Sequence, residues 1–147
     1  MANAKEIVVT LPGGRRVDAA VGPHLVRTDQ PRDSGGENTA PSPFELFLAS
    51  LGTCAGIFVQ GFCARRDIAS GGIRIRETVD FDAQGTLQRV RLVLELPRDF
   101  PHRYREALIR AVEQCSVKRA IQAQPAFEVR TTEAPTVEDT LQVTATG

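Results

Sequence analysis

Residues 40–54 form the stretch that decides the fold, and they read Ala-Pro-Ser-Pro-Phe-Glu-Leu-Phe-Leu-Ala-Ser-Leu-Gly-Thr-Cys. Ser42 is a favourable N-cap residue for a helix, and Pro43 suits the first helical position. Glu45 follows three residues after the cap, which is the spacing of a capping box, in which the serine hydroxyl and the glutamate carboxylate each accept a free backbone N–H. The pattern predicts a long helix that begins at Ser42 and runs to Arg66.

The predicted helix carries apolar side chains on nearly every side and has no polar face for solvent. A membrane span needs about 20 predominantly apolar residues, whereas glycine and glutamine interrupt this stretch, so a buried core helix is the better interpretation. A domain of this size rarely covers a helix on all sides by itself. We therefore expect a second copy of the chain to cover part of the helix in a homodimer.

Alternation of apolar and polar residues, together with turn residues, predicts extended segments over residues 7–9, 17–21, 25–26, 73–81, 90–96 and 127–131. A polar loop is expected over 28–40, an amphipathic helix over 101–114, and a short helix after Cys115. The whole chain of 147 residues is interpreted as one α+β domain. Its core spans about residues 5–131, and residues 132–147 are a tail or an added strand.

The composition excludes several classes of function. Lys and Arg number 18, as do Asp and Glu, so no basic excess is available to neutralise nucleic acid phosphates. The two histidines lack the spacing of a zinc site, and neither a metal nor another cofactor is expected. No apolar leader opens the chain, which predicts a cytoplasmic protein. Three cysteines do not suit a disulfide scaffold, but they leave thiol chemistry open at Cys54, Cys63 or Cys115.

Two separate stretches resemble the signatures of one family. Residues 40–54 are similar to the cysteine-helix signature of the OsmC/Ohr family, the osmotically inducible and organic hydroperoxide resistance proteins. Residues 113–118, Glu-Gln-Cys-Ser-Val-Lys, resemble the family's second signature. The resemblance covers about residues 5–131. It implies antiparallel sheets wrapped around a long, buried central cysteine helix, in an intertwined homodimer.

The same resemblance implies a reaction. Cys54 would supply the thiolate that attacks a hydroperoxide, and Cys115 would resolve the resulting sulfenic acid to a disulfide. An external dithiol would then reduce the disulfide. The chain is therefore expected to be a thiol peroxidase with a role in the oxidative stress response.

In hydroperoxide-reducing members of the family, an arginine stabilises the thiolate and a glutamate orients the arginine. Arg27 is the first candidate for that arginine, and Arg32, in the polar loop, is the second. Phe44 stands where the family has the glutamate. Its neighbour Glu45 lies nine residues before Cys54, which places the two on opposite faces of the helix. Helix capping explains Glu45 better than catalysis does.

Phe44, Phe47 and Phe58 are either core residues or the apolar pocket that would receive the organic part of the substrate. Because Phe44 replaces a carboxylate, an alternative function stays open. The chain would then be a non-catalytic family member that binds a small apolar molecule or senses oxidants. Cys63 matches no family motif and is predicted to be structural.

Overall fold

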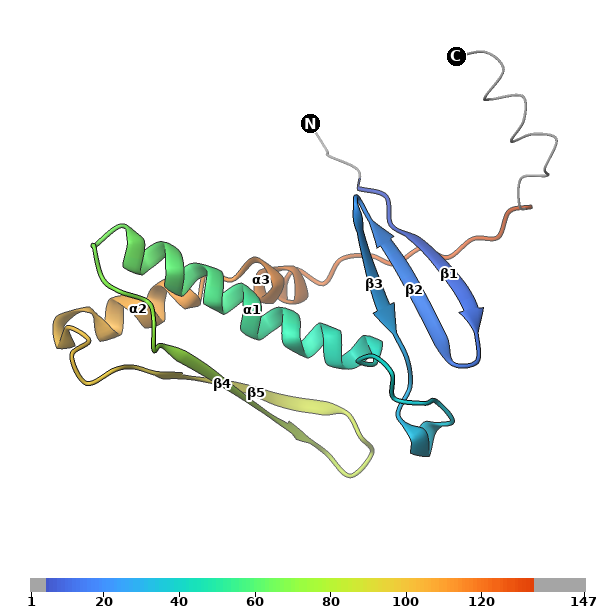
Figure 1. The fold of residues 1–147 in the computed structure, drawn as a ribbon, viewed down its shortest axis with the longest axis horizontal. Helices are drawn as coiled ribbons and strands as arrows, with labels where there is room; N and C mark the ends of the chain where they lie inside the picture. The colour runs from blue at the N-terminus through green and yellow to red at the C-terminus, as the bar shows by residue number, and fades with distance from the viewer. Residues whose placement is uncertain (1–4, 134–147) are drawn as a thin grey trace, which may run out of the picture.

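The structure, a computed structural model, describes residues 5–133. Figure 1 shows a long helix flanked by a small sheet, a hairpin and two shorter helices. In chain order the elements are β1 (Val8–Gly13), β2 (Arg16–Val21), β3 (His24–Thr28), η1 (Arg32–Ser34), α1 (Pro43–Ala64), β4 (Arg74–Phe81), β5 (Leu87–Glu95), η2 (His102–Tyr104), α2 (Arg105–Val112) and α3 (Ser116–Gln122).

The first three strands form an antiparallel sheet in the order β1-β2-β3, at the amino end of α1 (Figure 1). The loop that leads from this sheet to α1 is organised by Asp29, which is 1% exposed. Its carboxylate accepts hydrogen bonds from the Thr39 N–H at 3.0 Å and the Thr39 hydroxyl at 2.8 Å, and from the N–H groups of Gln30 and Glu37. Led by those from Thr39, these bonds lower the pKa of Asp29 to about 2. The buried carboxylate thereby fixes the approach to the long helix.

The predicted start of α1 is confirmed. The Ser42 hydroxyl accepts from the Glu45 N–H at 3.3 Å, and the Ser42 N–H donates to the Glu45 carboxylate at 2.7 Å. The helix ends at Ala64, two residues before the predicted end at Arg66. Helix α1 is long and apolar enough to cross a membrane. The core helices of soluble proteins often meet the same two criteria. In the structure it packs against α2, α3 and β4.

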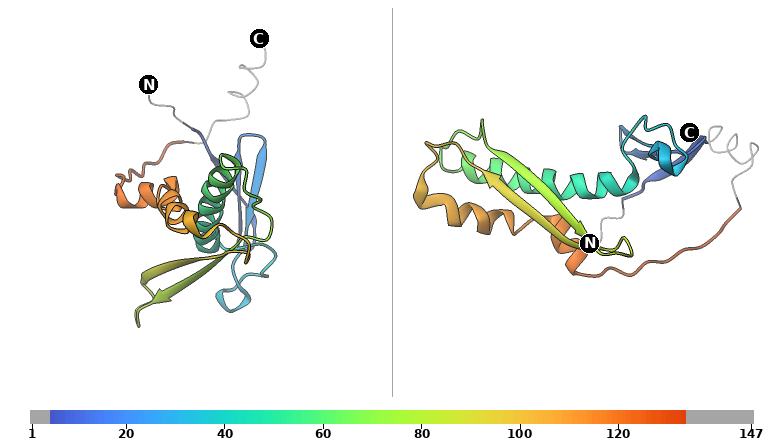
Figure 2. Two further views of the ribbon diagram at one scale, coloured as in Figure 1. Left: turned by 90° about the vertical axis from the view of Figure 1, so that its left-hand side faces the viewer. Right: turned by 90° about the horizontal axis from the view of Figure 1, so that it is seen from below.

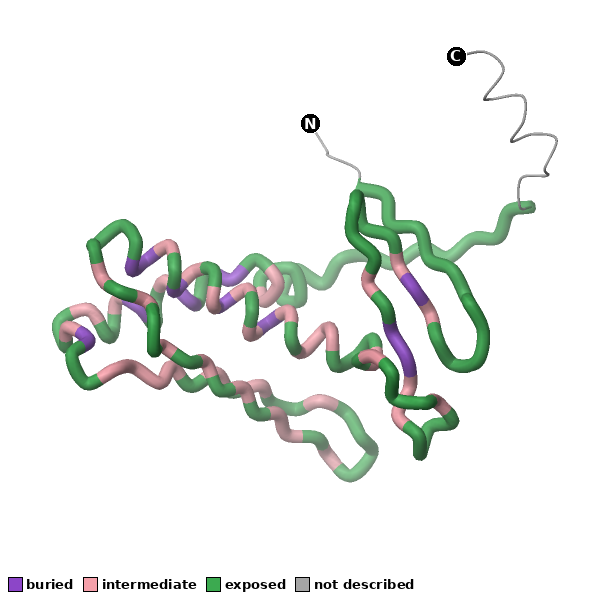
Figure 3. Tube along the Cα trace, in the orientation of Figure 1, coloured by how far each residue is buried: buried purple, intermediate pink, exposed green. Residues whose placement is uncertain are grey.

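The core lies on one side of α1, where the helix meets α2 (Figure 3). Leu108 and Ala55 are fully buried there, and Phe62 and Cys63 are nearly so. The β4–β5 hairpin runs along α1 (Figure 2) and packs Ile75, Leu92 and other partly buried apolar residues against the same core. The hairpin therefore forms as the alternating sequence pattern predicts, with strands paired from Arg74 with Glu95 to Phe81 with Leu87.

A single chain does not cover the rest of α1. Ile57, near the middle of the helix, is 66% exposed, and Ala49, Thr53 and Gln60 lie on the same open side. We predicted that α1 is buried on all sides. Among the described residues, the chain itself buries only one side of the helix.

The predicted last strand is wrong for the single chain. Residues 127–131 form no strand among the described residues, and Phe127 and Val129 are 90% and 95% exposed. A strand needs a neighbour to complete its backbone hydrogen bonds, and the segment runs past its own chain without one (Figure 1). The predicted helix over 101–114 is also shorter, because η2 precedes α2. The predicted tail lies outside the described residues from Ala134 onward.

Candidate functional site

The fold brings Cys54 and Cys115 together. Cys54 lies in the middle of α1, and Cys115 immediately precedes α3, which packs against α1. Both cysteines are free thiols; Cys54 is half-buried and Cys115 is 2% exposed. The Cys115 thiol donates a hydrogen bond to the Cys54 sulfur. Two residues far apart in sequence are therefore in contact through their reactive atoms.

The surroundings of Cys54 favour its thiolate. Burial acts to raise the pKa of Cys54, but hydrogen bonds from the 115–117 turn outweigh that effect and hold the pKa below its ordinary value. The donors are the Cys115 thiol, the Val117 N–H, and the hydroxyl and N–H of Ser116. The Ser116 Oγ lies 3.9 Å from the Cys54 Sγ. Donors that face a sulfur stabilise its anion, which is the nucleophilic form of cysteine.

The surroundings of Cys115 favour its thiol. Burial raises the pKa of Cys115, and donation of its proton to Cys54 raises it further. Its sulfur also accepts the Lys118 N–H at 3.5 Å and so forms the N-cap of α3. The pair is thus polarised: Cys54 loses its proton first, while Cys115 keeps its own.

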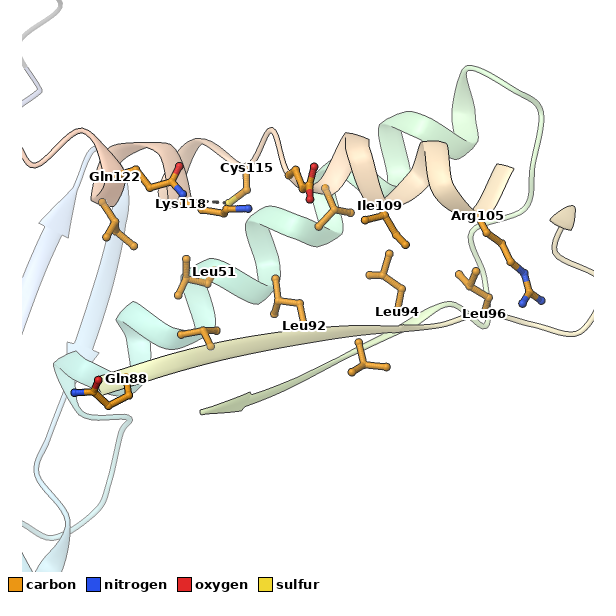
Figure 4. Close-up of a pocket in the computed structure, with 15 residues that line it drawn as sticks. Leu51, Gln88, Leu92, Leu94, Leu96, Arg105, Ile109, Cys115, Lys118 and Gln122 are labelled. Atoms are coloured by element: carbon orange, nitrogen blue, oxygen red, sulfur yellow. Dashed lines mark hydrogen bonds between the residues drawn. The ribbon is translucent and has the colours of Figure 1, made fainter. Parts of the chain in front are cut away.

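Cys115 also lines a groove with a volume of about 940 Å³. Figure 4 shows α2 and α3 on one side of this groove and β5 on the other, with Leu51 of α1 between them. Leucines 92, 94 and 96 make its floor apolar, whereas Lys118 and Gln122 stand beside Cys115 at one end. The groove suits an apolar occupant that reaches the buried thiol.

Three of the predicted polar candidates lie away from the thiol pair. Arg27 is on β3 and Arg32 is in η1, both at the amino end of α1, and within residues 5–133 neither is hydrogen-bonded to Cys54. The Glu45 carboxylate is engaged by Ser42, and these hydrogen bonds lower its pKa. Glu45 therefore acts as the helix cap.

Of the aromatic candidates, Phe44 and Phe47 lie near the amino end of α1, whereas Phe58 lies in its second half. The ring centres of Phe44 and Phe47 are 5.6 Å apart, and those of Phe44 and Phe81 are 6.0 Å apart. The groove beside Cys115 is lined by other residues, and Phe44, Phe47 and Phe58 are not among them. Within one chain, these rings and the groove are separate apolar features.

A family model described as OsmC-like protein matches residues 35–130. The chain belongs to the OsmC-like protein family. No curated protein sequence matches it closely enough to count as a relative. Among solved structures, an OsmC-like protein from Mycoplasma pneumoniae is similar over 84% of this chain and 91% of its own, with a TM-score of 0.68 and 14% identity.

Two further solved structures are organic hydroperoxide resistance proteins. The protein from Legionella pneumophila is 21% identical, with a TM-score of 0.54 over 83% of this chain and 91% of its own. OhrB of Bacillus subtilis is 20% identical, with a TM-score of 0.53 over 83% of this chain and 93% of its own. At these identities the likeness shows the fold, and the α+β arrangement with antiparallel sheets predicted from the sequence is confirmed.

In this OsmC-like protein, sequence reasoning missed Glu77 of β4. Its carboxylate lies against α1 where the helix has Gly52, and a Cβ at that glycine would come within 2.9 Å of Glu77 Oε2. Burial raises the pKa of Glu77, with a hydrogen bond from the Gly52 N–H acting in the opposite direction. Glu77 Oε1 is buried without a hydrogen-bond partner among the described residues. One sequence signal was available, because Glu77 breaks the apolar side of a strand that also carries Ile75 and Val79.

Ser116 was also missed as a functional residue. In sequence it is an ordinary polar residue after a cysteine, and only the packing of α3 on α1 turns its hydroxyl toward Cys54. Among residues 5–133, no three His, Cys, Asp or Glu side chains are grouped so that they could hold a metal ion.

Proposed function

We propose that this OsmC-like protein is a thiol peroxidase that reduces organic hydroperoxides as part of the oxidative stress response. The observation that carries the proposal is the contact between Cys54 and Cys115, whose pKa values are shifted in opposite directions. A peroxidase of this kind needs one ready thiolate and one protonated thiol within reach. The names of the Legionella and Bacillus proteins, which share the fold, support hydroperoxides as the substrate class.

The reaction follows from the two thiols. The Cys54 thiolate attacks the terminal oxygen of the hydroperoxide, the O–O bond breaks, and the leaving alkoxide takes a proton to become the alcohol. Cys54 is then a sulfenic acid. The Cys115 sulfur attacks the Cys54 sulfur, a disulfide forms, and the hydroxyl leaves as water with the Cys115 proton. A dithiol in the cytoplasm, where we propose that the protein works, reduces the disulfide and is itself oxidised.

We further propose that the working form is a homodimer. Apolar side chains of the described residues are left open to solvent: Ile57 on the uncovered side of α1 is 66% exposed, and Phe127 and Val129 are 90% and 95% exposed. A second copy of the chain would cover this apolar area. Light scattering after size exclusion should give twice the chain mass. A monomer at micromolar concentration would contradict the proposal.

Arg27 remains the first proposed source of the cation near the thiolate, with Arg32 second, and a second copy of the chain would supply it. Arg27→Met should raise the pKa of Cys54, because a cation favours the thiolate, and should lower kcat/KM. Arg32→Met is the matched variant, because it removes the same charge from the neighbouring loop. If neither substitution changes the alkylation pH profile of Cys54, the hydrogen bonds of the 115–117 turn activate the thiolate without an arginine.

Turnover decides the proposed activity. With a dithiol reductant, purified protein should consume tert-butyl hydroperoxide faster than hydrogen peroxide, and Cys54→Ser should reduce turnover to background. Cys63→Ala is the control, because Cys63 lies on the same helix inside the core and away from the pair. Turnover of the wild-type protein no faster than that of Cys54→Ser would refute the peroxidase.

A second candidate function is a non-catalytic member that binds a small apolar molecule, and the apolar groove beside Cys115 favours it. In that case an apolar carboxylic acid or alcohol should raise the unfolding temperature, and hydroperoxide would oxidise the thiols only once without turnover. Leu92→Asp in the groove should abolish the thermal shift. Catalytic turnover together with no ligand-induced shift would exclude this candidate.

A further inference from the structure

Two of the hydrogen bonds of the Cys115 sulfur hold different parts of the chain. On one side it donates its proton to Cys54 of α1. On the other side it accepts the Lys118 N–H at 3.5 Å, as the N-cap of α3 (dashed line in Figure 4). The backbone of Cys115 joins α2 to α3, because its N–H donates to the Val112 carbonyl and its carbonyl accepts from the Arg119 N–H.

Helix α3 depends on that cap more than α1 depends on its own. It has seven residues, and the Cys115 sulfur is the side chain that caps its first turn. Short helices are marginal in water, and a side-chain cap satisfies one of the N–H groups that the first turn leaves free. By comparison, α1 has 22 residues and a complete capping box.

We propose that formation of the Cys54–Cys115 disulfide removes the cap of α3 and opens the first turn of that helix. The proposal rests on the proposed function, which makes Cys115 the resolving thiol. In the disulfide the two sulfurs are about 2.05 Å apart, so the Cys115 sulfur moves toward α1 and away from the Lys118 N–H. A disulfide sulfur is also a weaker acceptor than a polarised thiol. Both effects weaken the 3.5 Å hydrogen bond from the Lys118 N–H to the Cys115 sulfur.

The opened turn gives the reductant access. Cys115 is 2% exposed in the reduced protein, and a dithiol can reduce the disulfide only if one of its thiolates approaches a sulfur in line with the S–S bond. Helix α3 contributes Lys118, Ile121 and Gln122 to the wall of the groove beside Cys115. Loosening α3 therefore widens the groove at the position of the disulfide. Oxidation itself would thus expose the disulfide to the dithiol that reduces it.

Two different oxidants can form the disulfide. The Cys54 sulfenic acid and the Cys115 thiol form the disulfide and release one water, after an organic hydroperoxide has been reduced to its alcohol. Diamide supplies the same oxidation independently, because its N=N bond takes up the two hydrogens of the dithiol. The disulfide can therefore be formed with or without peroxidase activity.

Amide hydrogen exchange tests the proposal on the full-length protein. After oxidation, verified by the loss of two mass units, the amides of Lys118 and Arg119 should exchange at least fivefold faster, while the Glu45 amide in the α1 cap should be unchanged. In Cys54→Ser, diamide should leave Lys118 protected, because the disulfide cannot form. In Cys115→Ser, the serine hydroxyl caps the helix, so protection should be equal or greater and insensitive to oxidant.

A quantitative disulfide with unchanged exchange at Lys118 overturns the proposal, and so does a protein in which neither diamide nor hydroperoxide forms the disulfide. If diamide forms the disulfide and opens α3 but cumene hydroperoxide does not react, the proposed opening of α3 is supported and the peroxidase function is refuted. A disulfide formed by both reagents, with faster exchange at Lys118, supports both.

Discussion

Cys54 and Cys63 lie nine residues apart on α1 and therefore on opposite faces of the same helix. Cys63 is 1% exposed among Phe62, Leu108 and other core side chains, and burial raises its pKa, with the charge of Arg66 acting in the opposite direction. Burial acts on Cys54 in the same direction, but the donors of the 115–117 turn reverse the outcome. Neighbouring hydrogen-bond donors, rather than the helix or the residue type, therefore decide which cysteine of this protein becomes a nucleophile.

The largest difference between the two cysteines should appear in their reactivity. With iodoacetamide at pH 7, we expect Cys54 to be modified at least about a thousandfold faster than Cys63, because Cys63 reacts only when the core opens. Peptide mapping by mass spectrometry at timed intervals measures both rates in one sample. In urea the two rates should converge. Similar rates for Cys54 and Cys63 in the native protein would show that the donors of the 115–117 turn do not activate Cys54.

A smaller effect is expected at Glu77, whose carboxylate lies against α1 at Gly52 and has one oxygen without a hydrogen-bond partner among the described residues. Burial raises the pKa of Glu77, so the folded protein binds its proton more tightly than the unfolded chain does. The ionised carboxylate therefore destabilises the fold at neutral pH, and the penalty vanishes below the unfolded pKa of about 4.3. Glu77→Gln should raise the free energy of unfolding by about 1 kcal/mol at pH 7.

Urea unfolding at pH 7 and at pH 4 measures this effect, which should be present at the higher pH and absent at the lower. Glu106→Gln is the control, because that side chain is 90% exposed and its loss should leave the stability unchanged. A destabilising Glu77→Gln at pH 7 would show that the carboxylate has a cationic partner in the assembled protein.

The smallest effect is expected at Ser116. Its hydroxyl is one of several donors to Cys54 and lies at the long distance of 3.9 Å, so Ser116→Ala should raise the pKa of Cys54 only slightly. We expect about a twofold slower alkylation of Cys54 at pH 7, with Cys63 unaffected. Ser116→Thr keeps a hydroxyl and should restore the rate. An unchanged pH profile in Ser116→Ala would assign the low pKa to the other donors of the turn.

Local sequence was sufficient wherever residues close in the chain interact. The cap at Ser42 and Glu45, the β4–β5 hairpin and the position of Cys115 before a short helix follow from spacing alone, and the structure confirms them. The same reasoning failed for residues 127–131. Their alternation is typical of a strand, but a strand exists only beside a partner, and the described part of the chain provides none.

Sequence by itself determined the helix that carries Cys54, the second motif around Cys115 and the family that both indicate. Only the tertiary structure decided that the two sulfurs meet, that the donors of the 115–117 turn favour the thiolate at Cys54, and that Cys63 is sealed in the core. The physical reason is the separation in sequence over which each interaction acts. Capping and strand alternation act over a few residues, whereas burial and hydrogen bonding to a sulfur depend on which distant segments pack around it.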